Sequence, residues 1–99
     1  MAALHIQRSH RLGLEAARAL TEHWVRDGTE RLGLTCELSR TEWEDVVVFR
    51  RTGLSGQLTV TPERFELRAQ LGFLLSAYHG RIADEIHRQL DAALGPSTD

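Results

Sequence analysis

The sequence predicts an α+β fold in which two helices cover one face of an antiparallel sheet. Apolar residues recur with the period of a helix near both ends of the chain and with the period of a strand between them, and the predicted strands are joined by short connections. With 99 residues, 41% hydrophobic and 26% charged, the chain can bury one modest core. We expect a two-layer sandwich in the order α-β-β-β-β-α, forming a single domain over residues 1–94.

The first predicted helix runs from about Leu14 to Leu32. Its apolar residues gather on one side of a helical wheel and its charged residues on the other. Pairs of opposite charge four residues apart, such as Arg18 and Glu22, support the exposed side. The pattern is typical of an amphipathic helix that packs on a sheet. Its apolar side comprises Leu14, Ala17, Leu20, Trp24, Val25, Gly28 and Leu32.

Four segments in the middle of the chain have the composition of strands with one buried face. The glycines in the run 52–56 and the proline at position 62 predict turns between them. Short connections between consecutive strands indicate a four-stranded meander. A further edge strand is predicted at His5–Arg8. The four main segments are 34–39, 45–51, 57–61 and 64–71.

The last predicted element is one helix from about Phe73 to Leu94. Gly95 and Pro96 end it, and residues 95–99 are expected to form a disordered tail. The predicted apolar stripe consists of Leu75, Tyr78, Ile82, Ile86, Leu90 and Ala93. The residues predicted to face away from the sheet are Arg81, Asp84, His87, Arg88 and Asp91.

Composition and charge narrow the classes of function. The net charge of −2 gives no overall field that favours nucleic acid. A single cysteine excludes an internal disulfide and fits a reducing compartment. The chain has neither a signal-peptide pattern at its start nor an apolar run of about 20 residues that would span a membrane. We therefore expect a cytoplasmic protein.

No motif in the sequence indicates catalysis, a cofactor or a metal. Cys36 is predicted to face the core of its strand, where a thiol is inert. The five histidines lack the spacing of metal ligands, and His79 falls on the apolar stripe, where a satisfied buried histidine is expected. No nucleophile elbow accompanies the serines. The carboxylate pairs Glu44-Asp45 and Asp84-Glu85 are interpreted as solvated charge. We expect no enzyme.

The predicted outer face of the sheet and its turns supply a candidate contact surface. Arg50, Arg64 and Arg68 are expected to share the outer face, interleaved with Glu37 and Glu66, as on an ordinary charged sheet surface. Apolar residues expected to be exposed are candidate anchors for a partner. Trp43, in a predicted turn, either covers the edge of the core or serves as such an anchor. The full candidate surface is Trp43, Val46, Val48, Arg50, Leu54, Arg64, Arg68 and Leu74.

Several stretches of the sequence form a pattern that covers roughly residues 4 to 92: His5–Arg18, Asp45–Gly56 and Leu71–Leu75, followed by Gly80-Arg81-Ile82 and Leu90-Asp91. In this pattern the sequence resembles the small bacterial polyhydroxyalkanoic acid system proteins. Most of these positions are predicted core or turn residues. The resemblance implies a protein that accompanies polyhydroxyalkanoate synthesis or breakdown, in some members at the granule surface. It carries no catalytic residues.

Three functions follow as hypotheses. The first is a non-enzymatic accessory protein that contacts the polyhydroxyalkanoate granule surface or a granule-associated protein. The second is a small carrier that holds an acyl or hydroxyacyl ligand between sheet and helices. The third, disfavoured by charge, is a nucleic-acid-binding regulator. An edge strand or the valine-bearing sheet face would support a homodimer. His5, Arg8 and His10 are assigned no functional role, since capping of the first helix is an equal explanation for Arg8 and His10.

Overall fold

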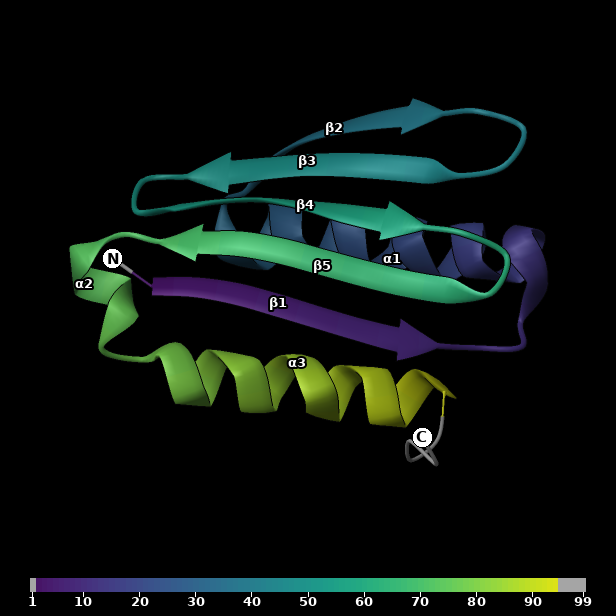
Figure 1. Ribbon diagram of the computed structural model, residues 1–99. Coiled ribbons are helices and arrows are strands. Elements are labelled where there is room, and N and C mark those ends of the chain that lie inside the picture. Colours follow the sequence, from purple (N-terminus) through teal and green to yellow (C-terminus); the bar gives the residue numbers. More distant parts are fainter. Residues whose placement is uncertain (1, 95–99) are drawn as a thin grey trace.

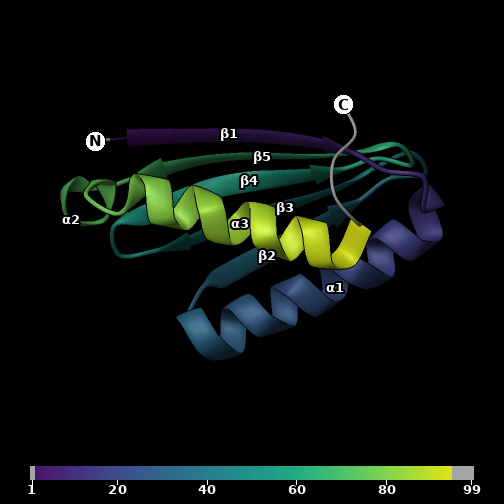
Figure 2. The ribbon, with the colours of Figure 1, turned by 90° about the horizontal axis from the view of Figure 1, so that it is seen from below.

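The computed structural model describes residues 2–94 and confirms the α+β prediction. Helices cover one face of a five-stranded antiparallel sheet and leave the other face open (Figures 1 and 2). The predicted tail, 95–99, lies outside the described residues. No helix within residues 2–94 is long and apolar enough to cross a membrane. The elements are β1 (Ala2–Ser9), α1 (Gly13–Leu32), β2 (Thr35–Arg40), β3 (Asp45–Arg51), β4 (Leu54–Val60), β5 (Arg64–Leu71), α2 (Phe73–Ser76) and α3 (His79–Leu94).

The strand order is β1-β5-β4-β3-β2, and every neighbouring pair is antiparallel. The N-terminal edge strand is confirmed and is longer than predicted. The chain begins at one edge of the sheet, crosses its inner face in α1, and returns strand by strand from the other edge (Figure 1). Opposite residues such as Val47 and Leu58 share the inner face, so the alternation of apolar and polar residues sets the register.

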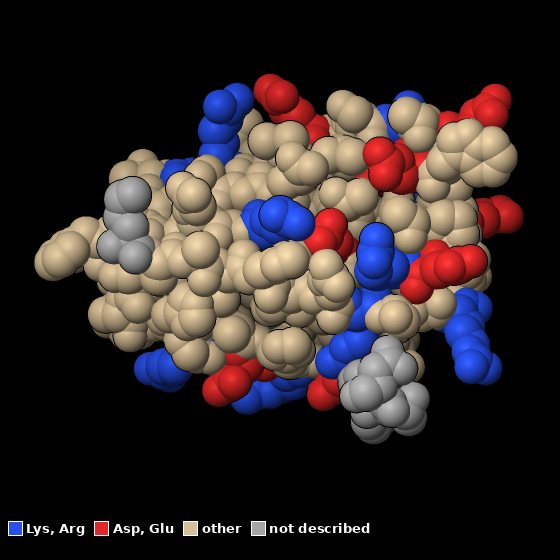
Figure 3. All heavy atoms as spheres, in the orientation of Figure 1, with Lys and Arg blue, Asp and Glu red and all other residues tan. Residues whose placement is uncertain are grey.

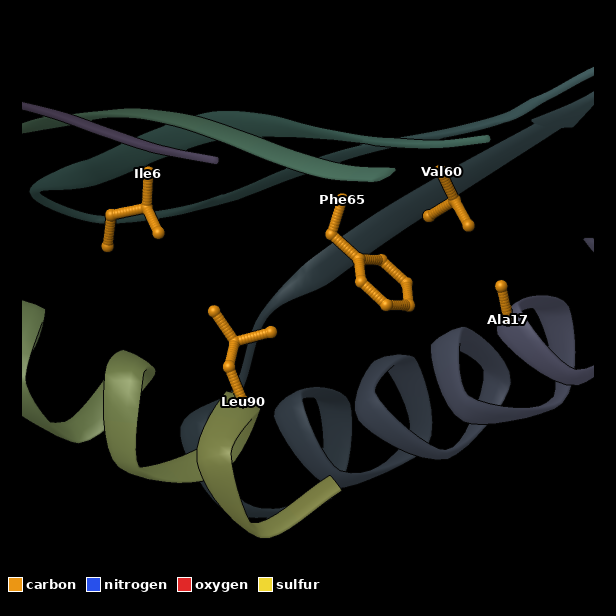
Figure 4. Close-up of a cluster of buried hydrophobic side chains, with 5 residues drawn as sticks. All are labelled: Ile6, Ala17, Val60, Phe65 and Leu90. Atoms are coloured by element: carbon orange, nitrogen blue, oxygen red, sulfur yellow. The ribbon is translucent and has the colours of Figure 1, made fainter. Parts of the chain in front are cut away.

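The core lies between the sheet and the two long helices. In Figure 4, Ile6, Val60 and Phe65 point from the strands toward Ala17 of α1 and Leu90 of α3. The indole of Trp24 meets the Phe65 ring edge-on, with ring centroids 5.1 Å apart. A second cluster of Leu4, Ala69 and Leu71 fills the other end of the inner face.

Helix α1 packs closely only along part of its predicted stripe. Ala17 and Gly28 are buried, but Leu32 is 54% exposed, which contradicts its assignment to the buried side. Figure 2 shows the reason: α1 diverges from the sheet toward its C-terminal end. The helix then ends at Gly33, which adopts a left-handed conformation with φ of 68° that favours glycine.

The prediction of one continuous C-terminal helix is wrong. The chain forms a single turn, α2, and then α3 after a break at Ala77-Tyr78. The N–H of Tyr78 bonds to the carbonyl of Leu75, three residues back, which tightens the chain at the break. The break lets Leu75 pack on the second core cluster while α3 runs beside β1 (Figure 1). Tyr78, predicted to be in the stripe, is consequently 51% exposed.

The glycine-rich turn is shorter than predicted. Only Thr52 and Gly53 form the turn, and Gly53 has φ of 81°. Gly56 lies within β4, where the Phe49 ring covers its Cα. A Cβ at this position would stand 2.5 Å from the Arg68 carbonyl oxygen and 2.6 Å from Cζ of Phe49. Gly56 is thus required by close packing rather than by a turn.

A buried carboxylate fixes α1 on the sheet, and the prediction that Asp45 is solvated is wrong. Its side chain is fully buried at the start of β3. Arg18 of α1 donates to Oδ1 at 2.8 Å, and Arg40 of β2 donates to Oδ2 at 3.0 Å. Arg40 also binds Glu22 at 2.6 Å, so two arginines and two carboxylates form a neutral cluster. The hydrogen bonds of Arg40, first to Glu22 and then to Asp45, raise its pKa.

Residues of the N-terminal motif position the helices. Arg8, buried on the inner face, donates to Asp91 of α3 at 2.7 Å, so Asp91 does not face away as predicted. His10 is buried with its ring 4.5 Å from that of Phe65, and its Nδ1 accepts the N–H of Leu12 at 3.1 Å. His10 therefore holds the start of α1, close to the capping role considered from the sequence.

Candidate contact surface

One end of the molecule presents a group of apolar side chains to solvent. We call it the apolar end and define it as Ala3, Phe73, Leu74 and Tyr78. Phe73 is 83% exposed and Leu74 79%, and the two are adjacent in α2. Scattered exposed apolar residues are normal on protein surfaces, but two large neighbouring ones with this exposure make this end the candidate contact surface.

The local structure explains why these side chains project. The N–H of Gly72 bonds to the carbonyl of Gly53 at 2.8 Å, which holds the start of α2 against the β3–β4 turn. A Cβ on Gly72 would lie only 3.2 Å from Cα of Gly53. Leu75 then points into the core, so Phe73 and Leu74 fall on the outward side of the single helical turn. The side chains are presented by a braced segment.

The ring of His79 joins α3 to the beginning of β1. Its Nε2 lies 2.9 Å from the carbonyl oxygen of Ala3, and the ring is half-buried. The prediction of a satisfied histidine is confirmed, whereas the prediction that it is buried is wrong. This contact brings Ala3 to the same end of the molecule as α2.

The apolar end carries few charges. The sequence from Leu71 to Gly80 contains no Lys, Arg, Asp or Glu. Figure 3 shows the consequence on the outer face: the region over α2 and the start of β1, at the left, is mostly uncharged, and acidic and basic side chains gather toward the opposite end. An apolar partner therefore meets little desolvation cost here.

The predicted outer-face residues lie where the alternation places them. Val46, Val48 and Arg50 project from the outer face of β3, and Arg64 and Arg68 from that of β5. Acidic neighbours interleave as expected. The Arg50 guanidinium lies 3.6 Å from Glu37, and that of Arg68 lies 3.4 Å from Glu66. These arginines sit beside opposite charge, which weakens the case for an anion-binding platform.

Glu66 is the most strongly perturbed carboxylate of the outer face. His5 Nε2 lies 2.8 Å from its Oε2, and the Gln7 amide donates to the same oxygen at 2.7 Å. These two bonds, followed by the nearby Arg68, lower the pKa of Glu66 from 4.5 to about 2. The outer face thus contains a small polar network across β1 and β5 that keeps Glu66 ionised.

Two other candidate residues, Leu54 and Trp43, differ in whether their side chains are exposed. Leu54 faces inward and packs on the cluster of Leu4, Ala69 and Leu71, so its prediction as an exposed residue is wrong. Trp43 is exposed in the β2–β3 turn, at the other end of the sheet from α2.

Of the candidates, only Leu74 belongs to the apolar end. Phe73 and Tyr78 were missed because both were read as parts of one helix, although the uncharged run Leu71–Gly80 could have revealed them.

The structure gives little support for bound ligands inside the fold. Trp24 packs on Phe65, and Phe49 packs on Gly56, where an acyl chain between sheet and helices would have to lie. An open depression lies instead between α1 and the end of β2, lined by Leu14, Glu15, Arg18, Ala19, Glu22 and Arg40. Within residues 2–94, no three His, Cys, Asp or Glu side chains are grouped to hold a metal ion.

Comparison with protein families gives one decisive match. Residues 4–94 match the family described as "Putative polyhydroxyalkanoic acid system protein". The chain belongs to this family. The match spans all three helices and all of the sheet except the first two residues of β1, and the family description names no enzymatic activity. No curated protein and no solved structure matched the chain.

Proposed function

We propose that the protein is a non-enzymatic accessory protein of the polyhydroxyalkanoate system, and that it binds the hydrophobic surface of the cytoplasmic storage granule through its apolar end. Family membership supports the system. The exposed pair Phe73 and Leu74 supports the contact, and it is the observation that carries the proposal. Most of the apolar residues of α1 and α3 are packed on the sheet, which favours the exposed residues of the apolar end as the contact.

The apolar end can make a substantial apolar contribution to binding. Full burial of a Phe or Leu side chain contributes about 1.5–3 kcal/mol. Phe73 and Leu74 together would therefore contribute several kcal/mol before the cost of immobilisation is subtracted. The brace between Gly72 and Gly53 reduces the ordering required on binding. A polyester surface requires no shape-matched pocket.

A granule-associated protein is the alternative target of the same surface. Exposed aromatic and aliphatic side chains serve protein contacts as well as polymer contacts. The two targets are separated by using granules in two forms, native and stripped of their proteins. A polymer-binding protein binds both forms, whereas a protein-binding one binds only the native granules.

The test is co-sedimentation through a density cushion. The purified chain is mixed with native granules, with protein-stripped polymer particles, or with polystyrene beads, and serum albumin is run in parallel. Saturable binding to both granule forms, in excess of binding to polystyrene and of albumin binding, is the expected result. If the protein remains in the supernatant with both granule forms, the proposed function is wrong. Binding to native granules alone would mean that the apolar end binds a granule-associated protein and not the polymer.

A further inference from the structure

The two edges of the sheet are protected to different degrees. β1 runs beside α3, where Asp91 pairs with Arg8 and His79 bonds to the carbonyl of Ala3 (Figure 1). β2 forms the other edge, and none of the elements in residues 2–94 lies beyond it. Nor does any described side chain hydrogen-bond a backbone group of Thr35–Arg40. A free row of backbone N–H and C=O groups is a template for pairing with another strand.

The β2 edge carries the charged side chains of Glu37 and Arg40 but lacks two other devices that prevent such pairing. It contains no proline, and its register with β3 runs without a bulge from Thr35 to Arg40. Leu38, on its inner face, is 41% exposed because α1 covers β2 only in part. Leu32 just before the strand and Trp43 just after it are also exposed. Three large exposed apolar side chains therefore lie along this unpaired edge or at its two ends.

The sequence of β2 fits a second copy of itself in one register. Opposite residues of an antiparallel pair share a face, so Leu38 can lie against Leu38 of the second copy across a two-fold axis. Glu37 then lies opposite Ser39, and no like charges oppose each other. The same register brings the turn that carries Trp43 alongside Leu32 and Gly33 of the second copy. A register centred on Glu37 would instead oppose two carboxylates, which is unfavourable.

We propose that the β2 edge is a self-association surface, at which two copies pair antiparallel with Leu38 on the two-fold axis. The pairing joins the sheets of the two copies into one and connects the exposed side chains of Leu38, Trp43 and Leu32 into a shared patch. Because a six-residue strand buries less area than a standard interface, the dimer is expected to be concentration-dependent. Helix α2 contacts β5, at the other side of the sheet, so the apolar end stays free.

Cysteine cross-linking tests the register directly. In a Cys36→Ser background, Leu38→Cys places two thiols on paired positions, where the Cα atoms lie about 5.5 Å apart and a disulfide forms readily. Thr35→Cys is the matched control, because its two copies would lie six residues apart along the strands, at about 20 Å. Glu37→Cys tests the competing register. Mild oxidation at about 0.1 mM protein should give covalent dimers chiefly with Leu38→Cys, since paired thiols are within bonding range.

A second measurement uses the unmodified fold. Sedimentation equilibrium of the natural chain should show a monomer–dimer equilibrium, and Leu38→Glu should shift it to monomer without changing the circular dichroism spectrum, because like charges would meet on the axis. The proposal is overturned if the natural chain stays monomeric at about 0.1 mM, a concentration at which weak edge pairing is populated. It is also overturned if Thr35→Cys or Glu37→Cys cross-links as well as Leu38→Cys.

Discussion

Asp45 on β3 and Arg18 on α1 join the two layers by an ion pair of 2.8 Å whose carboxylate is fully buried. The adjacent residue Glu44 has the same charge in the sequence, but among residues 2–94 only its backbone takes part in hydrogen bonds. A buried carboxylate stabilises a fold only while its partners satisfy it. Asp45 and Glu44 are therefore expected to contribute very differently to the free energy of unfolding.

Replacing Asp45 therefore tests how α1 is held. Asp45→Ala should lower the free energy of unfolding by about 2–4 kcal/mol, because two arginines lose their shared partner. Glu44→Ala is the matched control and should change it by less than about 0.5 kcal/mol. Urea unfolding followed by circular dichroism measures both. Equal effects of the two substitutions would contradict the buried ion pair.

The bonds of Glu66 predict a dependence of stability on pH. Its pKa is about 2 in the folded chain and near 4.5 when unperturbed, so its contribution is present above about pH 5 and is lost as the pH falls toward 2. Glu66→Gln should be less stable than the natural chain at neutral pH. The difference between the two should shrink as the pH is lowered through this window. Urea midpoints measured across the window check this, and a difference that does not change with pH would refute it.

Two glycines give a matched pair of packing tests. Gly56→Ala should destabilise the fold by about 2–4 kcal/mol, because its Cβ meets backbone and the Phe49 ring, which cannot move aside without disturbing the strands. Gly80→Ala has open space around its Cβ within α3 and should be neutral or stabilising by up to about 1 kcal/mol. Thermal unfolding of both variants measures the effects. A mild effect of Gly56→Ala would mean that β4 does not approach β5 this closely.

The pair of Arg8 and Asp91 holds the C-terminal half of α3. Asp91→Ala should lower the free energy of unfolding by about 1–2 kcal/mol, because Arg8 loses an ion-pair partner. The effect is expected to be modest, since Asp91 is half exposed and the buried Arg8 retains other contacts. Amide hydrogen exchange should increase mainly near Leu90. Asp84→Ala, on the exposed side of the same helix, is the control. Unchanged exchange in Asp91→Ala would show that packing alone holds α3.

The sequence predicts the elements of this fold well where apolar residues recur with a clear period. The first helix and the main strands lie where the pattern places them, and the edge strand at His5–Arg8 is confirmed with greater length. The break at Ala77-Tyr78 escaped the prediction because the apolar spacing continues through it. Its cause is tertiary: Leu75 packs at the end of the sheet while α3 turns to follow β1.

Charge placement was harder to predict than apolar placement. The sequence pattern predicts Asp45 as solvated charge and Asp91 as a residue facing away from the sheet, yet each pairs with a distant arginine. Local sequence cannot identify partners that lie 27 or 83 residues away. For the same reason, the candidate surface included the inward-facing Leu54 and omitted Phe73. The uncharged run Leu71–Gly80 was the available signal, and it becomes meaningful once Leu75 alone is seen to face the core.

The most direct test of the proposed function compares two double variants in granule binding. Phe73→Ser with Leu74→Ser removes the exposed pair of the apolar end, and Val46→Ser with Val48→Ser removes an apolar pair from the outer face as the control. The first should weaken binding to protein-stripped polymer particles by at least about tenfold, because several kcal/mol of apolar burial is lost. The second should bind like the natural chain. Equal affinity of all three proteins would contradict a contact through α2.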